Sequence, residues 1–137
     1  MKIYCRYCDK VTKHHEKGVR TPVTICSKCN TTNMPITLIK SNGEMHFATQ
    51  VKFVEWSAEE LGSRAKQLHA EPALGFSCIL DPQYSYQYTW LTTQITEIVS
   101  DDSGKDMRKI VFRTKNSEYS LYISNAELRS AEPIINL

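Results

Sequence analysis

Four cysteines in two identical pairs, Cys5-x-x-Cys8 and Cys26-x-x-Cys29, are the residues of this chain best suited to chemistry. Each pair fits a tight turn, and the 17 residues between Cys8 and Cys26 are enough for one β-hairpin. Such a hairpin brings four thiolates to the corners of a tetrahedron around one ion, and this ligand set at this spacing is typical of zinc. The sequence therefore predicts one structural Zn2+ bound by all four cysteines.

The residues beside the pairs favour turns of this kind. In a zinc knuckle the residue after the second Cys often needs positive φ, and Asp9 and Asn30 are of the types that tolerate it best after glycine. Lys10 and Lys28 can offset the net charge of about −2 on a four-thiolate zinc site. Residues 1 to about 45 together resemble a zinc ribbon, although the Cys-Pro-x-Cys-Gly pattern of the common ribbon is not present.

Three other uses of the cysteine pairs fit the sequence less well than zinc does. No apolar signal segment follows Met1, which predicts a reducing cytoplasm and argues against disulfides. A thioredoxin-like redox motif needs one Cys-x-x-Cys at a helix start and not two on hairpins. Rubredoxin-type iron takes four thiolates too, but the Pro and Gly residues usual in its knuckles are missing. Zinc is the preferred interpretation.

The other candidates for metal or catalytic chemistry are few. His14 and His15 are expected to be exposed loop residues, because four cysteines already saturate the ion, and Cys78 is expected to be a small core residue. The sequence has no Gly-rich phosphate loop, no His-Glu-x-x-His and no nucleophile elbow. A closed zinc site also leaves no position for substrate, so the protein is expected not to be an enzyme and to have no small-molecule substrate.

Composition and charge limit the class of protein. The chain has 137 residues, of which 41% are hydrophobic, and no apolar run is long enough to span a membrane. Residues 1–45 carry a net charge of +5 and residues 46–137 a net charge of −3. With zinc the first part is only mildly basic, which is less than a dedicated DNA-neutralising surface has.

The expected fold class is α+β and mostly antiparallel β, with a zinc ribbon at residues 1–48 and a second domain at residues 49–137. Residues 36–40 and 45–54 are predicted strands around an Asn42-Gly43 turn, and the first strand is expected to complete the ribbon's sheet. A helix is predicted from Ala58 to Ala70. Its signals are an N-cap at Ser57 with its capping-box glutamate and an apolar stripe; these residues are Ser57, Glu60, Leu61, Ala65 and Leu68.

The second half is predicted to be a small bent antiparallel sheet or SH3-like barrel, closed by one helical turn headed by Ser124 and Glu127. The candidate strands are 76–80, 84–91, 93–100, 109–114 and 118–123. The patterns Trp90-x-Thr92-Thr93-x-Ile95 and Thr114-x-Asn116-Ser117-x-Tyr119-x-Leu121 resemble those of small proteins from phages and plasmids of Gram-positive bacteria. That resemblance covers about 35 residues and implies a mobile-element origin without an activity.

Two sets of residues in the second half are candidates for binding. Aromatic side chains alternate along one strand and share one face, where they could stack bases or form the core; core or partner contact is the favoured interpretation. These residues are Tyr84, Tyr86, Tyr88 and Trp90. Four cations on one hairpin could follow a phosphate backbone or simply face solvent: Arg108, Lys109, Arg113 and Lys115. The ribbon adds Lys10, Lys13, Lys17 and Arg20.

The sequence therefore predicts a small zinc-ribbon regulatory binding protein that is cytoplasmic and has no membrane partner. In the first hypothesis it is a protein-binding adaptor or inhibitor that acts on nucleic-acid machinery, since Tyr and Trp are enriched in protein interfaces. In the second hypothesis it binds DNA or RNA directly through the cations of the ribbon and of the 108–115 hairpin. The sequence leaves the choice between a protein and a nucleic-acid partner open.

Overall fold

The computed structural model describes residues 2–19, 23–59, 62–82, 90–105 and 107–124, and within these ranges all regular structure is β. The strands near the N-terminus are β1 (Lys2–Cys5), β2 (Lys10–Lys17), β3 (Val23–Cys26) and β4 (Thr32–Asn33). The remaining strands are β5 (Ile36–Lys40), β6 (Met45–Ala48), β7 (Val51–Glu59), β8 (Gly62–His69), β9 (Ser77–Leu80), β10 (Trp90–Ser103), β11 (Met107–Thr114) and β12 (Glu118–Ser124). None of the described segments forms a helix long and apolar enough to cross a membrane.

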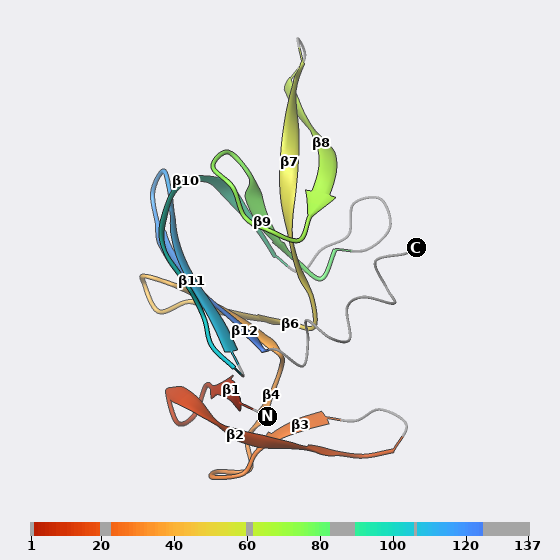
Figure 1. Cartoon of the computed structure of the whole chain (residues 1–137), viewed down its shortest axis with the longest axis vertical. Coiled ribbons are helices and arrows are strands. Elements are labelled where there is room, and N and C mark those ends of the chain that lie inside the picture. Colours follow the sequence, from red (N-terminus) through yellow and green to blue (C-terminus); the bar gives the residue numbers. More distant parts are fainter. Residues whose placement is uncertain (1, 20–22, 60–61, 83–89, 106, 125–137) are drawn as a thin grey trace.

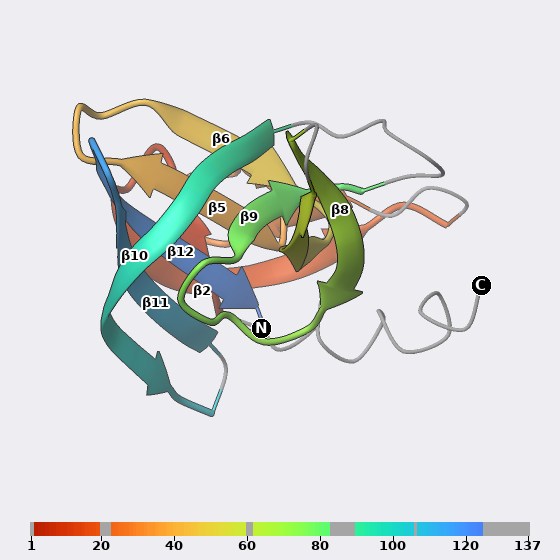
Figure 2. The same cartoon turned by 90° about the horizontal axis from the view of Figure 1, so that it is seen from above.

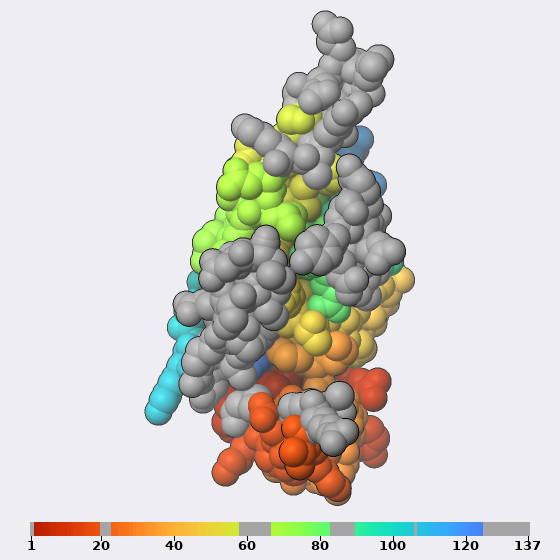
Figure 3. Space-filling model, turned by 90° about the vertical axis from the view of Figure 1, so that its right-hand side faces the viewer, coloured from red at the N-terminus to blue at the C-terminus, as the bar shows by residue number. Residues whose placement is uncertain are grey.

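The strands form two antiparallel sheets. The first has the order β1-β2-β3-β4 and is called the ribbon below; the second has the order β6-β5-β12-β11-β10-β9-β7-β8. Figure 1 shows the ribbon at one end of the molecule and the β7–β8 hairpin projecting at the other end. Seen from above, in Figure 2, the larger sheet curls strongly, and its long strand β10 runs diagonally across the view. The space-filling view in Figure 3 shows the ribbon as a distinct lobe below the larger sheet.

The predicted helix at residues 58–70 is wrong, and with it the α+β class. Strand β7 pairs with β8 from Phe53–His69 to Glu59–Gly62, and its first half pairs with β9 from Val51–Leu80 to Val54–Ser77. The buried side chain of Phe53 joins the core, and the indole Nε1 of Trp56 donates a hydrogen bond of 2.9 Å to Ser77 Oγ. Cross-strand pairing and burial therefore outweigh a capping box and a narrow stripe, which are weak helix signals.

The role predicted for residues 36–40 is also wrong, although they do form a strand. Strand β5 pairs with β12 and β6 in the larger sheet and does not complete the ribbon. The hairpin turn to β6 is as predicted, with Gly43 at φ 93° and its amide donating to the carbonyl of Lys40. The division into domains at residues 1–48 and 49–137 stays a prediction, and the helical turn predicted after Ser124 lies outside the described residues.

The hydrophobic core belongs to the larger sheet. It is formed by Ile36, Leu38, Ala48, Val51, Phe53, Cys78, Leu80, Ile95, Ile110, Phe112, Tyr119, Leu121 and Ile123. Strand β11 shows the expected alternation, because Ile110, Phe112 and Thr114 are buried while Arg113 is exposed. Cys78 is fully buried in this core, as predicted, and burial raises the pKa of its thiol.

The corner between β6 and β7 is fastened to the end of β9. One carboxylate oxygen of Asp81 accepts hydrogen bonds from the amides of Thr49 and Gln50, both at 2.9 Å, and from Thr49 Oγ1 at 2.8 Å. The amide of Asp81 donates to the carbonyl of Gln50 at 3.0 Å. Because Asp81 has φ 49°, its backbone lies in the left-handed region that only a few residue types tolerate. This corner clip joins the β6–β7 corner to the residue after β9.

Candidate metal centre

Two tight turns of the ribbon bring the four paired cysteines together. Cys5 and Cys26 are the last residues of β1 and β3, and the hairpin of β2 and β3 between the pairs forms as predicted. The sulfur atoms of Cys5, Cys8, Cys26 and Cys29 all lie within 4.8 Å of one another. Cys5 and Cys26 are buried, while Cys8 and Cys29 are partly exposed. The four residues are therefore placed to bind one metal ion.

The distances between the sulfur atoms fit tetrahedral coordination. Metal–sulfur bonds of about 2.3 Å to zinc place neighbouring sulfurs about 3.8 Å apart. Here Cys5 Sγ lies 3.5 Å from Cys29 Sγ, and Cys8 Sγ lies 4.0 Å from Cys26 Sγ. A disulfide needs a sulfur–sulfur distance of about 2.0 Å, so neither of these two pairs is bridged. The ribbon topology and the cysteine cluster together are consistent with a zinc ribbon.

The two turns have the backbone of zinc knuckles. The amide of Asp9 donates to the carbonyl of Cys5, and the amide of Asn30 donates to the carbonyl of Cys26, both at 2.8 Å. Asp9 has φ 55° and Asn30 has φ 64°, so the prediction of positive φ at these two positions is confirmed. The amide of Cys8 lies 3.4 Å from Cys5 Sγ and donates to it. Such amide–sulfur bonds stabilise a thiolate, which is the form that binds a metal.

The surroundings shift the pKa of Cys26 and Cys5 in one direction and that of Cys8 in the other. Burial alone would raise the pKa of Cys26, but hydrogen bonds from Thr12 and from the amides of Cys29 and Lys28 outweigh it and lower the pKa to about 6. The pKa of Cys5 is also lowered, since hydrogen bonds outweigh its burial. Burial and the neighbouring thiols raise the pKa of Cys8 to about 12. Four thiolates this close together repel one another, and a cation between them removes that repulsion.

Two buried polar residues, Asn33 and His14, lie next to the cysteine cluster. Asn33, which is 4% exposed, has its Nδ2 3.0 Å from Nε2 of His14, and its Oδ1 accepts from the amide of Arg6 at 3.2 Å. Nδ1 of His14 lies 2.9 Å from the carbonyl of Thr12, so the ring donates from Nδ1 and accepts at Nε2. His14 is 2% exposed and lies within β2, which makes the predicted exposed-loop position wrong for it. His15 lies in the same strand but is exposed.

The ribbon contacts the larger sheet through aromatic side chains. Tyr4 stacks on Tyr122 of β12 with ring centroids 4.8 Å apart, and the guanidinium of Arg6 lies 5.7 Å from the ring centroid of Phe47. The hydroxyl of Tyr4 donates to Asp9 in the first knuckle. Burial and this bond raise the pKa of Tyr4, so the phenol remains a neutral donor. One side chain of β1 thus connects the knuckle with β12.

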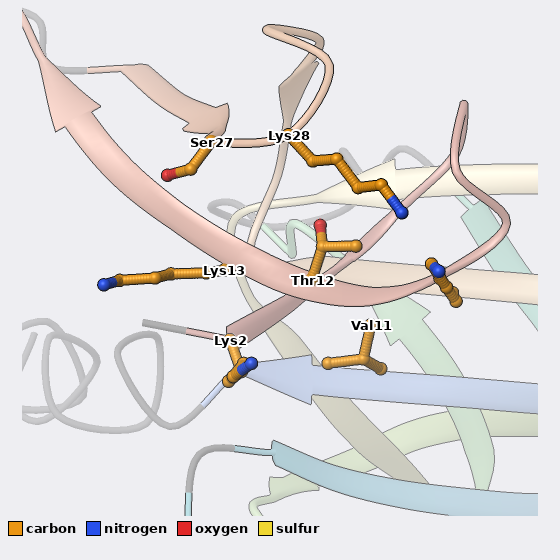
Figure 4. A pocket seen from close by; sticks show the side chains of 7 residues that line it. Lys2, Val11, Thr12, Lys13, Ser27 and Lys28 are labelled. Carbon is orange, nitrogen blue, oxygen red and sulfur yellow. The ribbon is translucent and has the colours of Figure 1, made fainter.

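Four lysines of the ribbon line a shallow hollow of about 420 Å³. Its lining residues are Lys2, Lys10, Val11, Thr12, Lys13, Ser27 and Lys28, and none of them is acidic. Figure 4 shows that they come from β1, from β2 and from the knuckle after β3. Interaction with Lys28 lowers the pKa of Lys10, as expected for two neighbouring ammonium groups. Of the ribbon cations named from the sequence, Lys10 and Lys13 line the hollow, Lys17 is exposed in β2, and Arg20 lies outside the described residues.

The cations of the 108–115 hairpin mostly have acidic neighbours. Arg108 pairs with Asp101 at 2.7 Å and with Glu71 at 2.6 Å, and its side chain is only 14% exposed. Arg113 lies 3.3 Å from Glu97 and 3.5 Å from Glu118. Lys109 faces Asp102 across the strand pair and lies over the ring of Tyr122, while Lys115 is exposed after β11. This hairpin therefore carries a mixed charge.

Only one residue of the aromatic stripe is described. Trp90 packs against the core and stacks on His46 with ring centroids 3.8 Å apart. Tyr84, Tyr86 and Tyr88 lie outside the described residues, so the role of the stripe stays a prediction.

The sequence arguments missed several residues of the ribbon. Lys2 and Ser27 join the hollow through strand pairing and not through neighbouring positions in the sequence. The sequence predicts Lys28 as a counter-charge to the metal but not as a lining residue of the hollow. The buried Asn33 had one available signal, since it follows the second knuckle by four residues in a polar stretch.

No protein-family model, curated protein or solved structure matches this chain. The comparisons thus give no support to the resemblance with phage and plasmid proteins.

Proposed function

We propose that the cysteine cluster binds one Zn2+ as a structural ion and that the protein is a zinc-dependent binding protein of nucleic-acid machinery. The single observation that carries the proposal is the convergence of four thiols, two of them buried, within 4.8 Å of one another. Thiolate donors in a tetrahedral set favour zinc over the hard cations, which prefer oxygen. Four protein ligands complete the coordination, so the ion stabilises the fold and has no position for substrate.

The ribbon has only a small hydrophobic core of its own, so a bound zinc ion would contribute much of its stability. Four short strands bury few large apolar side chains of their own, and Ile3 and Tyr4 are the main ones. A small sheet of this kind needs an additional link between its strands, and metal binding supplies folding free energy directly. The ion would join the ends of β1 and β3, and the Tyr4–Tyr122 contact would carry that order to the larger sheet.

The surface of the ribbon is better suited to binding a partner than to catalysing a reaction. The ribbon holds the excess positive charge of the chain, and four of its five lysines line one hollow. An adaptor that binds proteins would be expected to present an aromatic or aliphatic anchor in a large apolar patch. Within the described part of the chain, the exposed large apolar side chains lie on separate strands and loops, namely Tyr7, Val11, Val19, Val23, Leu68, Leu74 and Val99. The charge distribution therefore favours an anionic partner.

Hydrogen exchange tests the structural role of the metal. Removing zinc from the full-length protein with a chelator should abolish amide protection in β1–β4 and leave β9–β12 protected, and added zinc should restore it. Protection of β2 and β3 that is unchanged after complete metal removal would contradict the proposal.

A further inference from the structure

We propose that the lysine hollow of the ribbon binds the phosphate backbone of a nucleic acid. The proposal rests on the proposed binding function of the zinc-held ribbon and names its partner. It assigns the contact to the lysines at positions 2, 10, 13 and 28, assisted by the exposed hydroxyl of Ser27. It also removes the 108–115 hairpin from the binding surface.

The ribbon places like charges side by side. Lys2 and Lys13 are direct partners across the antiparallel pair of β1 and β2, so their side chains leave the sheet on the same face. Lys10 and Lys28 line the same hollow. Like charges directly opposite one another destabilise a sheet. An arrangement that costs stability and is repeated at one hollow is typical of a surface that an anion neutralises.

The lysines of the hollow differ from the hairpin cations in their acidic neighbours. Among the described residues none of the four lysines forms an ion pair, whereas Arg108 and Arg113 each contact two carboxylates. An incoming phosphate would have to displace those carboxylates on the hairpin. At the hollow it would meet ammonium groups that pair with no described carboxylate, so binding there costs less.

The lining of the hollow suits a nucleic-acid partner better than an acidic protein partner. Lysine is depleted in the cores of protein interfaces, and most of their free energy comes from buried aromatic, arginine and aliphatic anchors. The hollow offers one apolar side chain, Val11, which is 38% exposed. Lysines combined with Ser and Thr hydroxyls are instead the usual partners of phosphate oxygens in nucleic-acid complexes. The lining therefore fits a backbone of repeated phosphates.

A structural explanation exists for half of the cluster. Lys10 and Lys28 lie beside the knuckles, where they can offset the negative charge of a zinc–thiolate site. Lys2 and Lys13 are three and five residues from the nearest paired cysteine in the sequence. They are therefore less well placed to offset the charge of the zinc–thiolate site. The decisive variant is therefore Lys2→Ala combined with Lys13→Ala.

The experiment measures fluorescence anisotropy of labelled oligonucleotides of about 20 nucleotides with the zinc-loaded full-length protein over a range of salt concentrations. Single-stranded DNA, its duplex and RNA of the same sequence are the probes. Four phosphate contacts predict a slope of log K against log salt of about −3.6 for duplex and about −2.8 for single strands. The Lys2→Ala/Lys13→Ala variant should bind about tenfold more weakly at low salt, with a slope smaller by about 2.

The matched control is Arg113→Ala combined with Lys115→Ala, which removes the same charge from the hairpin and should change the affinity less than about twofold. Equal losses in the two double variants, or no binding by the wild-type protein at low salt, would overturn the proposal. Zinc content and melting temperature are measured for every protein. A wild-type protein without zinc would refute the proposed function, whereas zinc-loaded lysine variants with unchanged binding would refute only this inference.

Discussion

Tyr4 of β1 stacks on Tyr122 of β12 with ring centroids 4.8 Å apart and ring planes inclined by 25°. The contact joins the first cysteine knuckle to the larger sheet, because the hydroxyl of Tyr4 donates to Asp9. Arg6 beside Phe47 is a second contact between the two sheets. The stacked pair is therefore expected to couple the stability of the ribbon to that of the larger sheet.

The first prediction concerns this coupling. Tyr122→Ala should lower the free energy of unfolding by about 1–2 kcal/mol, since it removes the stacking and part of the buried area. Tyr122→Phe keeps the ring and should cost less than about 0.5 kcal/mol. Urea denaturation of the two variants checks the prediction, and equal effects of the two substitutions would show that stacking is not the cause.

The second prediction concerns the corner clip at Asp81. Asp81→Ala removes an acceptor of three hydrogen bonds and places alanine at φ 49°, so it should destabilise the protein by about 1–3 kcal/mol. Asp81→Asn keeps an acceptor oxygen and a residue type that tolerates positive φ, and should lose less than half as much. Thermal denaturation distinguishes the two. A larger loss for Asp81→Asn would mean that the charge matters more than the geometry.

The third prediction concerns how the stability contributed by the Asp101–Arg108 ion pair depends on pH. Hydrogen bonds from Arg108 lower the pKa of Asp101 below its ordinary value of 3.8. A depressed carboxyl pKa contributes stability that is fully present above the ordinary pKa and is lost as the pH falls through the folded value. Because the Asp101 side chain is 33% exposed, Asp101→Asn should cost only about 0.5 kcal/mol at pH 7.

Chemical denaturation at pH 7 and at pH 3 checks this hairpin prediction. The difference between Asp101→Asn and the wild-type protein should shrink at pH 3, where the wild-type carboxyl begins to take up its proton. A difference that grows on acidification would have the wrong sign for a depressed pKa.

The sequence predicted the local features of the metal centre well because short-range geometry determines them. A Cys-x-x-Cys pair fits one turn, and the positive φ of Asp9 and Asn30 follows from the same turn. The larger strands were also recognisable by alternation, as for Ile110 and Phe112. These signals lie within a few residues of one another, so no knowledge of tertiary contacts was needed.

The failures depended on contacts between distant residues. The helix predicted from Ser57 and Glu60 used local capping rules, while the structure is decided by pairing of β7 with β8 and β9. Neither the pairing of β5 with β12 nor that of Lys2 with Lys13 has a local signal. The lysine hollow could therefore not be found before the register of β1 and β2 was known.

The measurement that tests the central claim most directly is the zinc content of the purified protein, determined by native mass spectrometry together with elemental analysis. The account predicts one zinc per chain, loss of that zinc in Cys5→Ser, and retention in Cys78→Ser, which removes the fifth cysteine away from the cluster. Folded wild-type protein without metal, or Cys5→Ser protein that still binds one zinc with a protected ribbon, would contradict it.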